Sequence, residues 1–162
     1  MTRFGVLAFS VLALVALAPA TPAHADAAPP AVGSGCPADL TGVMTLLPDR
    51  TTYAVCGQAG VAYTWTVVQT PFAPNDRWLS YGPAITLHGQ GMRNPNLSAG
   101  RWTAAPRTVE ATCRAVQTAV VEAGVLAAPQ VFEGGRGSAL TLELPATAFY
   151  VELAGECLWS KL

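Results

Sequence analysis

The chain has 162 residues and a formal net charge of −1, with nine basic residues against ten acidic ones. Such a balance gives no general attraction to nucleic acid or to an anionic membrane surface, and we expect neither as a partner. The length fits one domain with a substantial hydrophobic core.

The first 25 residues have the pattern of a secretory signal peptide. Arg3 precedes an apolar run from Phe4 to Ala18, and Ala23-His24-Ala25 provides a small-residue cleavage site. The run is too short to span a bilayer comfortably. We therefore expect residues 1–25 to be removed, and the remaining 137 residues to be secreted to the extracellular side without membrane insertion.

Residues 26–35 (DAAPPAVGSG) contain little that a core would bury, and they predict a flexible leader. A single domain is expected over 36–162. It holds four cysteines, Cys36, Cys56, Cys113 and Cys157, and an even number in a short exported chain indicates two disulfides. Three pairings are possible, and we favour Cys36–Cys56 with Cys113–Cys157. No C-x-x-C pair is present, so neither a metal site nor a cofactor is expected.

Short strands separated by turn residues follow along the domain. Residues 43–47 and 52–56 flank a Pro-Asp-Arg turn, and 62–69 (AYTWTVVQ) alternate strongly. Residues 85–88 form one clear alternating piece inside a loop-rich stretch from 70 to 101. Arg101-Trp102-Thr103 begins another strand. The closing stretch 138–162 predicts two half-buried strands, with Cys157 and Trp159 on the face that meets the core.

The segment 106–125 fits two structures equally well by its periodicity. A helix over 108–123 would have Thr108 as N-cap and Gly124 as C-cap. A strand would alternate Val109, Ala111, Cys113 and Ala115 with polar residues.

Residues 98–162 resemble a small module common in secreted actinobacterial proteins. Ser98-Ala99-Gly100-Arg101-Trp102 resembles its "P-G-T-Y" strand opening, and Ala111-Thr112-Cys113-Arg114 falls where the module has "G-C-Y-W". The stretches 140–144, 148–149 and 155–159 resemble its closing "V-x-I…A-F…C-G-x-W" pattern. The resemblance implies that 106–125 is β and that Cys113 pairs with Cys157. It implies no activity.

The expected fold is all-β: a disulfide-stapled β-sandwich of about eight or nine short strands. The alternative is an α+β fold with one helix at 108–123. We expect a hairpin between 130–132 and 139–144, followed by the strand from Phe149 onward.

Catalytic residues are not expected, because no motif supports them. His88 is the only histidine after the signal peptide, and a small secreted hydrolase would need it as base, with Asp76 to orient it and Ser80 as nucleophile. Its position on the strand 85–88 favours a solvent-facing residue. A protease inhibitor, using a rigid loop around Gly57–Gly60, is a further alternative.

Aromatic residues give the remaining indication of function. Trp65 and Trp159 share the parity of apolar neighbours and are predicted to be core. Asp76, Arg77, Trp78 and Tyr81 lie together in a loop-rich stretch, where exposed aromatics beside charges are typical of an interface. We therefore expect a non-catalytic, monomeric secreted protein that binds a cell-envelope component or a protein partner through loops.

Overall fold

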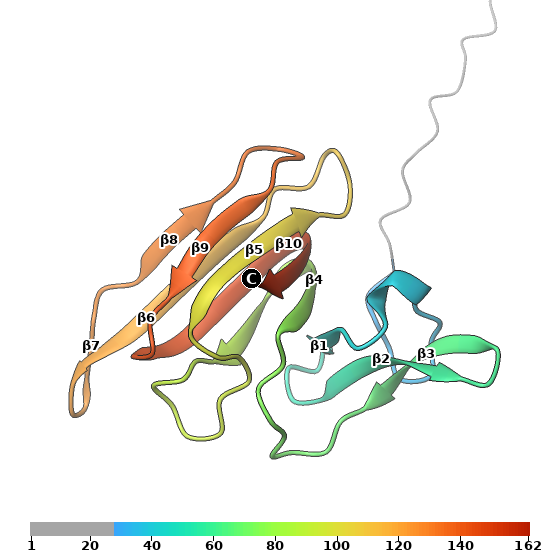
Figure 1. Cartoon of the computed structure of the whole chain (residues 1–162), viewed down its shortest axis with the longest axis horizontal. Helices are drawn as coiled ribbons and strands as arrows, with labels where there is room; N and C mark the ends of the chain where they lie inside the picture. Colours follow the sequence, from blue (N-terminus) through green and yellow to red (C-terminus); the bar gives the residue numbers. More distant parts are fainter. Residues whose placement is uncertain (1–27) are drawn as a thin grey trace, which may run out of the picture.

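The computed structural model describes residues 28–162, and the predicted signal peptide lies outside the described residues. The described chain is all-β, as predicted, with one short 3-10 turn (Figure 1). Within it, no helix is long and apolar enough to cross a membrane. The elements are η1 (Ala38–Leu40), β1 (Met44–Leu46), β2 (Tyr53–Ala59), β3 (Ala62–Val67), β4 (Arg77–His88), β5 (Gly100–Pro106), β6 (Arg114–Glu122), β7 (Val125–Leu126), β8 (Gln130–Glu133), β9 (Leu140–Leu144) and β10 (Ala148–Lys161).

The long strand β10 joins the whole fold. One edge pairs with β4 from Tyr150 opposite His88 to Ser160 opposite Arg77. The other edge pairs first with β6, over residues 148–154, and then with β5, over residues 157–161. β8 continues beyond β6 and β9 continues beyond β5, so the β4–β10 pair is common to both arms of a sandwich (Figure 1).

The change of partner occurs at a pair of glycines. Gly155 in β10 faces Gly82 in β4, and both have a positive φ, of 87° and 117°. A Cβ on Gly155 would lie 2.1 Å from the carbonyl oxygen of Thr112, whereas one on Gly82 would meet nothing within 4 Å. Gly155 is therefore required because the chain before β6 passes directly against β10.

The main core is the set of buried side chains that the two arms share. Three tryptophans, Trp78, Trp102 and Trp159, are fully buried in it. The rest come mainly from β1, β4, β5, β6, β9 and β10: Met44, Leu46, Ile85, Leu87, Leu97, Ala104, Cys113, Ala115, Leu142, Leu144, Ala148, Val151, Leu153 and Cys157. Burial of such large aromatic and branched side chains is the dominant favourable term of the fold.

A second, smaller cluster lies beside the first disulfide. It contains Leu40, Val43, Leu47, Ala54, Cys56, Trp65 and Leu79. β1, β2 and β3 extend the sheet from β4, with β1 parallel to β4 at Met44 opposite Trp78. Leu79 and Leu158 contact this cluster, while Trp78 and Trp159 contact the main core. Adjacent residues of β4 and β10 thus face opposite sides, as the period of a strand requires.

Both favoured disulfides are present. Cys36 bonds to Cys56 and Cys113 bonds to Cys157. The second bond is fully buried in the main core, and it ties the start of β6 to β10. Disulfides of this kind indicate an oxidising environment for the folded protein.

Three sequence expectations differ from the structure. The segment 108–123 forms a turn followed by strand β6, so the helix alternative is wrong, and Gly124 serves the turn to β7. The predicted hairpin between 130–132 and 139–144 is also wrong, because β8 pairs with β6 and β9 pairs with β5. The connection between them passes from one arm to the other.

The third difference concerns the predicted leader. Residues 33–36 add to the free edge of β3: the Gly33 N–H donates to Trp65 O at 2.8 Å and the Trp65 N–H donates to Ser34 O at 2.9 Å. Pro30 is buried. The ordered part of the chain therefore begins before Cys36, because main-chain hydrogen bonds hold a segment whose side chains have little to bury.

Candidate functional site

The four residues predicted to form a binding surface are not a surface loop. All except Asp76 lie in β4, and Trp78 is fully buried. Its indole N–H donates to Asn75 O at 2.9 Å, so the ring is a core residue and the expectation of an exposed Trp78 is wrong. Asp76 accepts a hydrogen bond from the Ser98 hydroxyl. Asp76 is exposed, and Arg77 and Tyr81 are half-buried.

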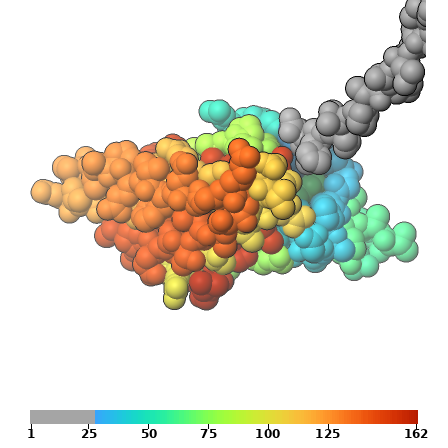
Figure 2. All heavy atoms as spheres, turned by 90° about the horizontal axis from the view of Figure 1, so that it is seen from above, coloured from blue at the N-terminus to red at the C-terminus, as the bar shows by residue number. Residues whose placement is uncertain are grey.

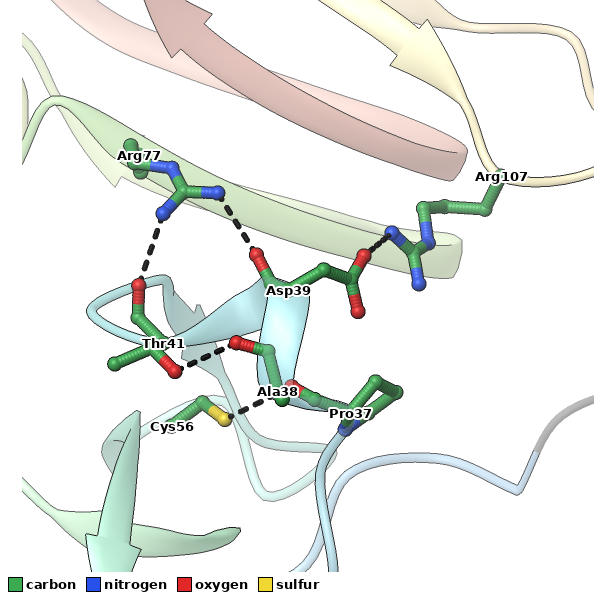
Figure 3. A network of polar contacts seen from close by, with 7 residues as sticks. All are labelled: Pro37, Ala38, Asp39, Thr41, Cys56, Arg77 and Arg107. Carbon is green, nitrogen blue, oxygen red and sulfur yellow. Dashed lines mark hydrogen bonds and ion pairs between the residues drawn. The ribbon is translucent and has the colours of Figure 1, made fainter.

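Arg77 holds the short 3-10 turn η1 in place (Figure 3). Its guanidinium donates to Thr41 O at 2.9 Å and to Asp39 O at 3.0 Å. Arg107, which follows β5, forms an ion pair with the Asp39 carboxylate from the other side. The hydrogen bond from Arg107 is the main cause that lowers the pKa of Asp39. Two arginines from distant parts of the chain thus fix η1 against the sheet.

A groove of about 390 Å³ lies beside η1. Its wall includes two aromatic residues, Trp65 and Tyr81, and the apolar residues Leu40 and Leu79. Arg107, Thr108 and Glu156 add polar groups to the wall. The remaining wall comes from the N-terminal segment: Ala28, Pro30, Ser34, Gly35 and Pro37. Apolar and aromatic walls with a few polar groups are typical of binding sites.

Tyr81 also lines a second groove, of about 370 Å³. That groove is mostly apolar, with Leu46, Pro48, Pro83 and Ile85 in its wall. The Tyr81 hydroxyl donates to Leu46 O at 2.9 Å, and burial is the first cause that raises the pKa of Tyr81. Tyr81 is thereby a fixed aromatic wall between two adjacent hollows.

We call residues 28–35 the strap, because they cross the region between the two grooves. Pro29 lines one groove and Pro30 lines the other. Within the strap, Ser34 N donates to Ala31 O at 3.0 Å, and Gly33 has a φ of 79°. These features define a tight turn with glycine at its third position, which then leads into the pairing with β3.

The residues considered for hydrolysis do not form a catalytic chain. Ser80 is fully buried, and its hydroxyl accepts a 2.9 Å hydrogen bond from the Trp159 indole N–H. His88 ends β4, with its ring 6.1 Å from that of Tyr150. A nucleophile needs a neighbouring base within hydrogen-bond reach, and the partner of Ser80 is Trp159 instead of His88.

The loop considered for protease inhibition is a tight hairpin. Gly57 and Ala59 lie inside β2, and the exposed part runs over residues 58–62 around the turn at Gly60 and Val61. The opposite, narrow end of the molecule is formed by the chain around β7 (Figure 2). β6, β7 and β8 carry four exposed apolar side chains. These are Val121, Val125, Leu126 and Val131.

Sequence reasoning missed the groove because its residues come from five separate stretches. Trp65 had been assigned to the core by its parity, and it does contact the smaller cluster. Neither Glu156 nor Arg107 carries a sequence motif that would single it out. The turn chemistry at Ala31–Ser34 was the available indication that the strap is ordered.

No family model, curated protein or solved structure matches this chain.

Proposed function

We propose that the protein is a secreted, non-catalytic binding module that holds a cell-envelope partner in the groove beside η1. The observation that supports the proposal most directly is the composition of this groove, whose wall includes Trp65, Tyr81, Arg107 and Glu156. Trp65 is 3% exposed, so the half-buried Tyr81 is the aromatic side chain that a partner can contact, and aromatic side chains are enriched at binding sites.

The rigidity of the surroundings also supports binding. Arg77 and Arg107 hold η1 from two sides, and the Cys36–Cys56 disulfide fastens the segment that follows the strap. A preformed wall reduces the ordering cost of association. The two disulfides fit an extracytoplasmic location, where a partner at the envelope is accessible.

The proposal is tested by binding to washed envelopes of the producing organism. Labelled, oxidised protein (residues 26–162) is titrated onto the envelopes, and saturable binding is expected. Pro37→Arg places a long charged side chain on the exposed wall of the groove, and we expect it to weaken binding by about tenfold, since a misplaced charge at an apolar contact costs more than 1 kcal/mol.

The matched control is Leu126→Arg, which adds the same charge at the exposed narrow end of the molecule. It should bind like the unchanged protein. Equal binding by both variants, or an absence of saturable binding, would contradict the proposed function.

A further inference from the structure

We infer that the strap occupies the binding site of the partner. The partner is an extended polypeptide strand that replaces the strap on the edge of β3. This inference rests on the proposed function, because it specifies the chemical class of the ligand and the way in which it binds. The groove and the edge of β3 belong to one surface, since Trp65 lies in β3 and in the wall of the groove.

The main-chain contacts of the strap define the recognition chemistry. Gly33 and Ser34 exchange hydrogen bonds with Trp65, and the Cys36 N–H donates to Tyr63 O at 3.0 Å. Gly35 is paired with Thr64 in antiparallel orientation. These are the bonds that an added β-strand makes, and they do not depend on the identity of its side chains.

Side-chain contacts add little to the hold of the strap. Residues 31–35 are all exposed, including Val32 at 57%, and Pro30 is the buried member. Within residues 28–35, two main-chain hydrogen bonds to Trp65 and one buried proline are few contacts to resist local opening. It is therefore suited to exchange with a competing strand.

The position of the strap indicates what its departure would expose. Pro29 and Pro30 separate the two grooves that share Tyr81. Without them, the two hollows would form one trough along Tyr81, next to an unpaired strand edge. An extended segment containing proline fits such a trough, because proline stacks on aromatic walls and favours the extended conformation.

The test uses the strap itself as the probe, as an acetylated and amidated peptide of residues 28–35, APPAVGSG. The protein of residues 26–162 is changed at Gly33→Pro. Proline cannot adopt the φ of 79° and has no N–H for Trp65 O, so the tethered strap is released from the edge of β3, while β3 and Tyr81 keep their own residues. The control is Gly124→Pro, which breaks an exposed turn with a φ of 77° between β6 and β7.

Binding is followed by NMR titration of the Trp65 amide. A tethered segment competes at an effective concentration on the order of millimolar, so its release should tighten peptide binding by about tenfold. The Gly124→Pro variant should bind like the unchanged protein. A second peptide, APPAVPSG, lacks the N–H that bonds to Trp65 O and should bind at least fivefold more weakly.

Two results would overturn the inference: no gain in peptide binding for Gly33→Pro, or equal binding of the two peptides. The outcome is independent of the envelope titration. If Gly33→Pro binds the peptide but not envelopes, the strand-accepting edge stands and the proposed function fails. If envelopes bind as proposed while the peptide is not taken up, the inference fails by itself.

Discussion

The two disulfides lie in contrasting regions of the molecule. Cys113 and Cys157 are both 0% exposed and are surrounded by the main core. Cys36 is half-buried, and its bond to Cys56 fastens the end of the strap and η1 to the sheet. The first pair holds the arms of the sandwich together, whereas the second fastens the segment before η1 to Cys56 in β2. One region therefore carries stability, and the other offers an exchangeable contact.

The largest effect is expected from the buried bond. Cys113→Ala and Cys157→Ala should each lower the free energy of unfolding by about 4 kcal/mol, and the two variants should behave alike because they break the same bond. Chemical denaturation of the oxidised proteins measures this. A near-neutral result for one variant would show that the bond is not the common cause.

The bond at the surface should matter less. Cys36→Ala and Cys56→Ala are expected to cost about 3 kcal/mol at most in the same experiment, because the closed loop is shorter, at 20 residues against 44. Hydrogen exchange of the Trp65 amide should accelerate in these variants before that of β10. Uniform acceleration over the whole chain would contradict the division into two regions.

Alanine substitutions at Gly155 and Gly82 distinguish the cost of a steric clash from the cost of an unfavourable φ. Gly155→Ala should cost about 2 kcal/mol more than Gly82→Ala. Both positions have a positive φ, but only at Gly155 does a Cβ meet a carbonyl oxygen, that of Thr112. Thermal unfolding of the two variants gives the difference. Equal losses of stability in the two variants would mean that the backbone at Thr112 moves away from the new Cβ at little cost.

The smallest effect concerns acid pH at the turn between β1 and β2. Hydrogen bonds from the Thr52 hydroxyl and from the N–H groups of Thr51 and Thr52 lower the pKa of Asp49 to about 2. Because the folded pKa lies below the unfolded value of 3.8, its contribution to stability is present above that pH.

The contribution is lost as the pH falls through 2. Asp49→Asn should therefore be less stable than the unchanged protein at pH 5, and the difference should shrink toward pH 2. If the difference in stability between Asp49→Asn and the unchanged protein did not change with pH, the charge of Asp49 would not be its cause.

Alternation and turn residues were enough to predict most of the strands and the half-buried closing strands, whereas the all-β prediction over 106–125 needed the family resemblance. They failed over Arg77–Tyr81 for a physical reason. Trp78 and Ser80 face the main core while Leu79 faces the smaller cluster, so both faces of this strand are covered and no apolar–polar alternation appears. The following Gly82-Pro83 has the composition of a turn, although it lies inside β4.

Strand pairing was not predictable from neighbouring segments. The short connections between β8, β9 and β10 favour consecutive hairpins, yet β5 lies between β9 and β10. This order is set by long-range burial, since Leu142 and Leu144 join the core that β5 and β10 share. The groove was unpredictable for the same reason. It brings the strap, Trp65, Tyr81, Arg107 and Glu156 together only after the strands have paired.

The shared strand β10 has a consequence for cooperativity. It is hydrogen-bonded to β4, β5 and β6, so opening either arm of the sandwich removes a partner from the other. The β-sandwich should then unfold as one unit, with slow-exchanging amides of similar protection in both arms. Residues 33–36 pair with β3 and would exchange through a separate and less costly opening, while the Cys36–Cys56 bond keeps the segment attached to β2. A protein built this way can release its edge strand without loosening its core.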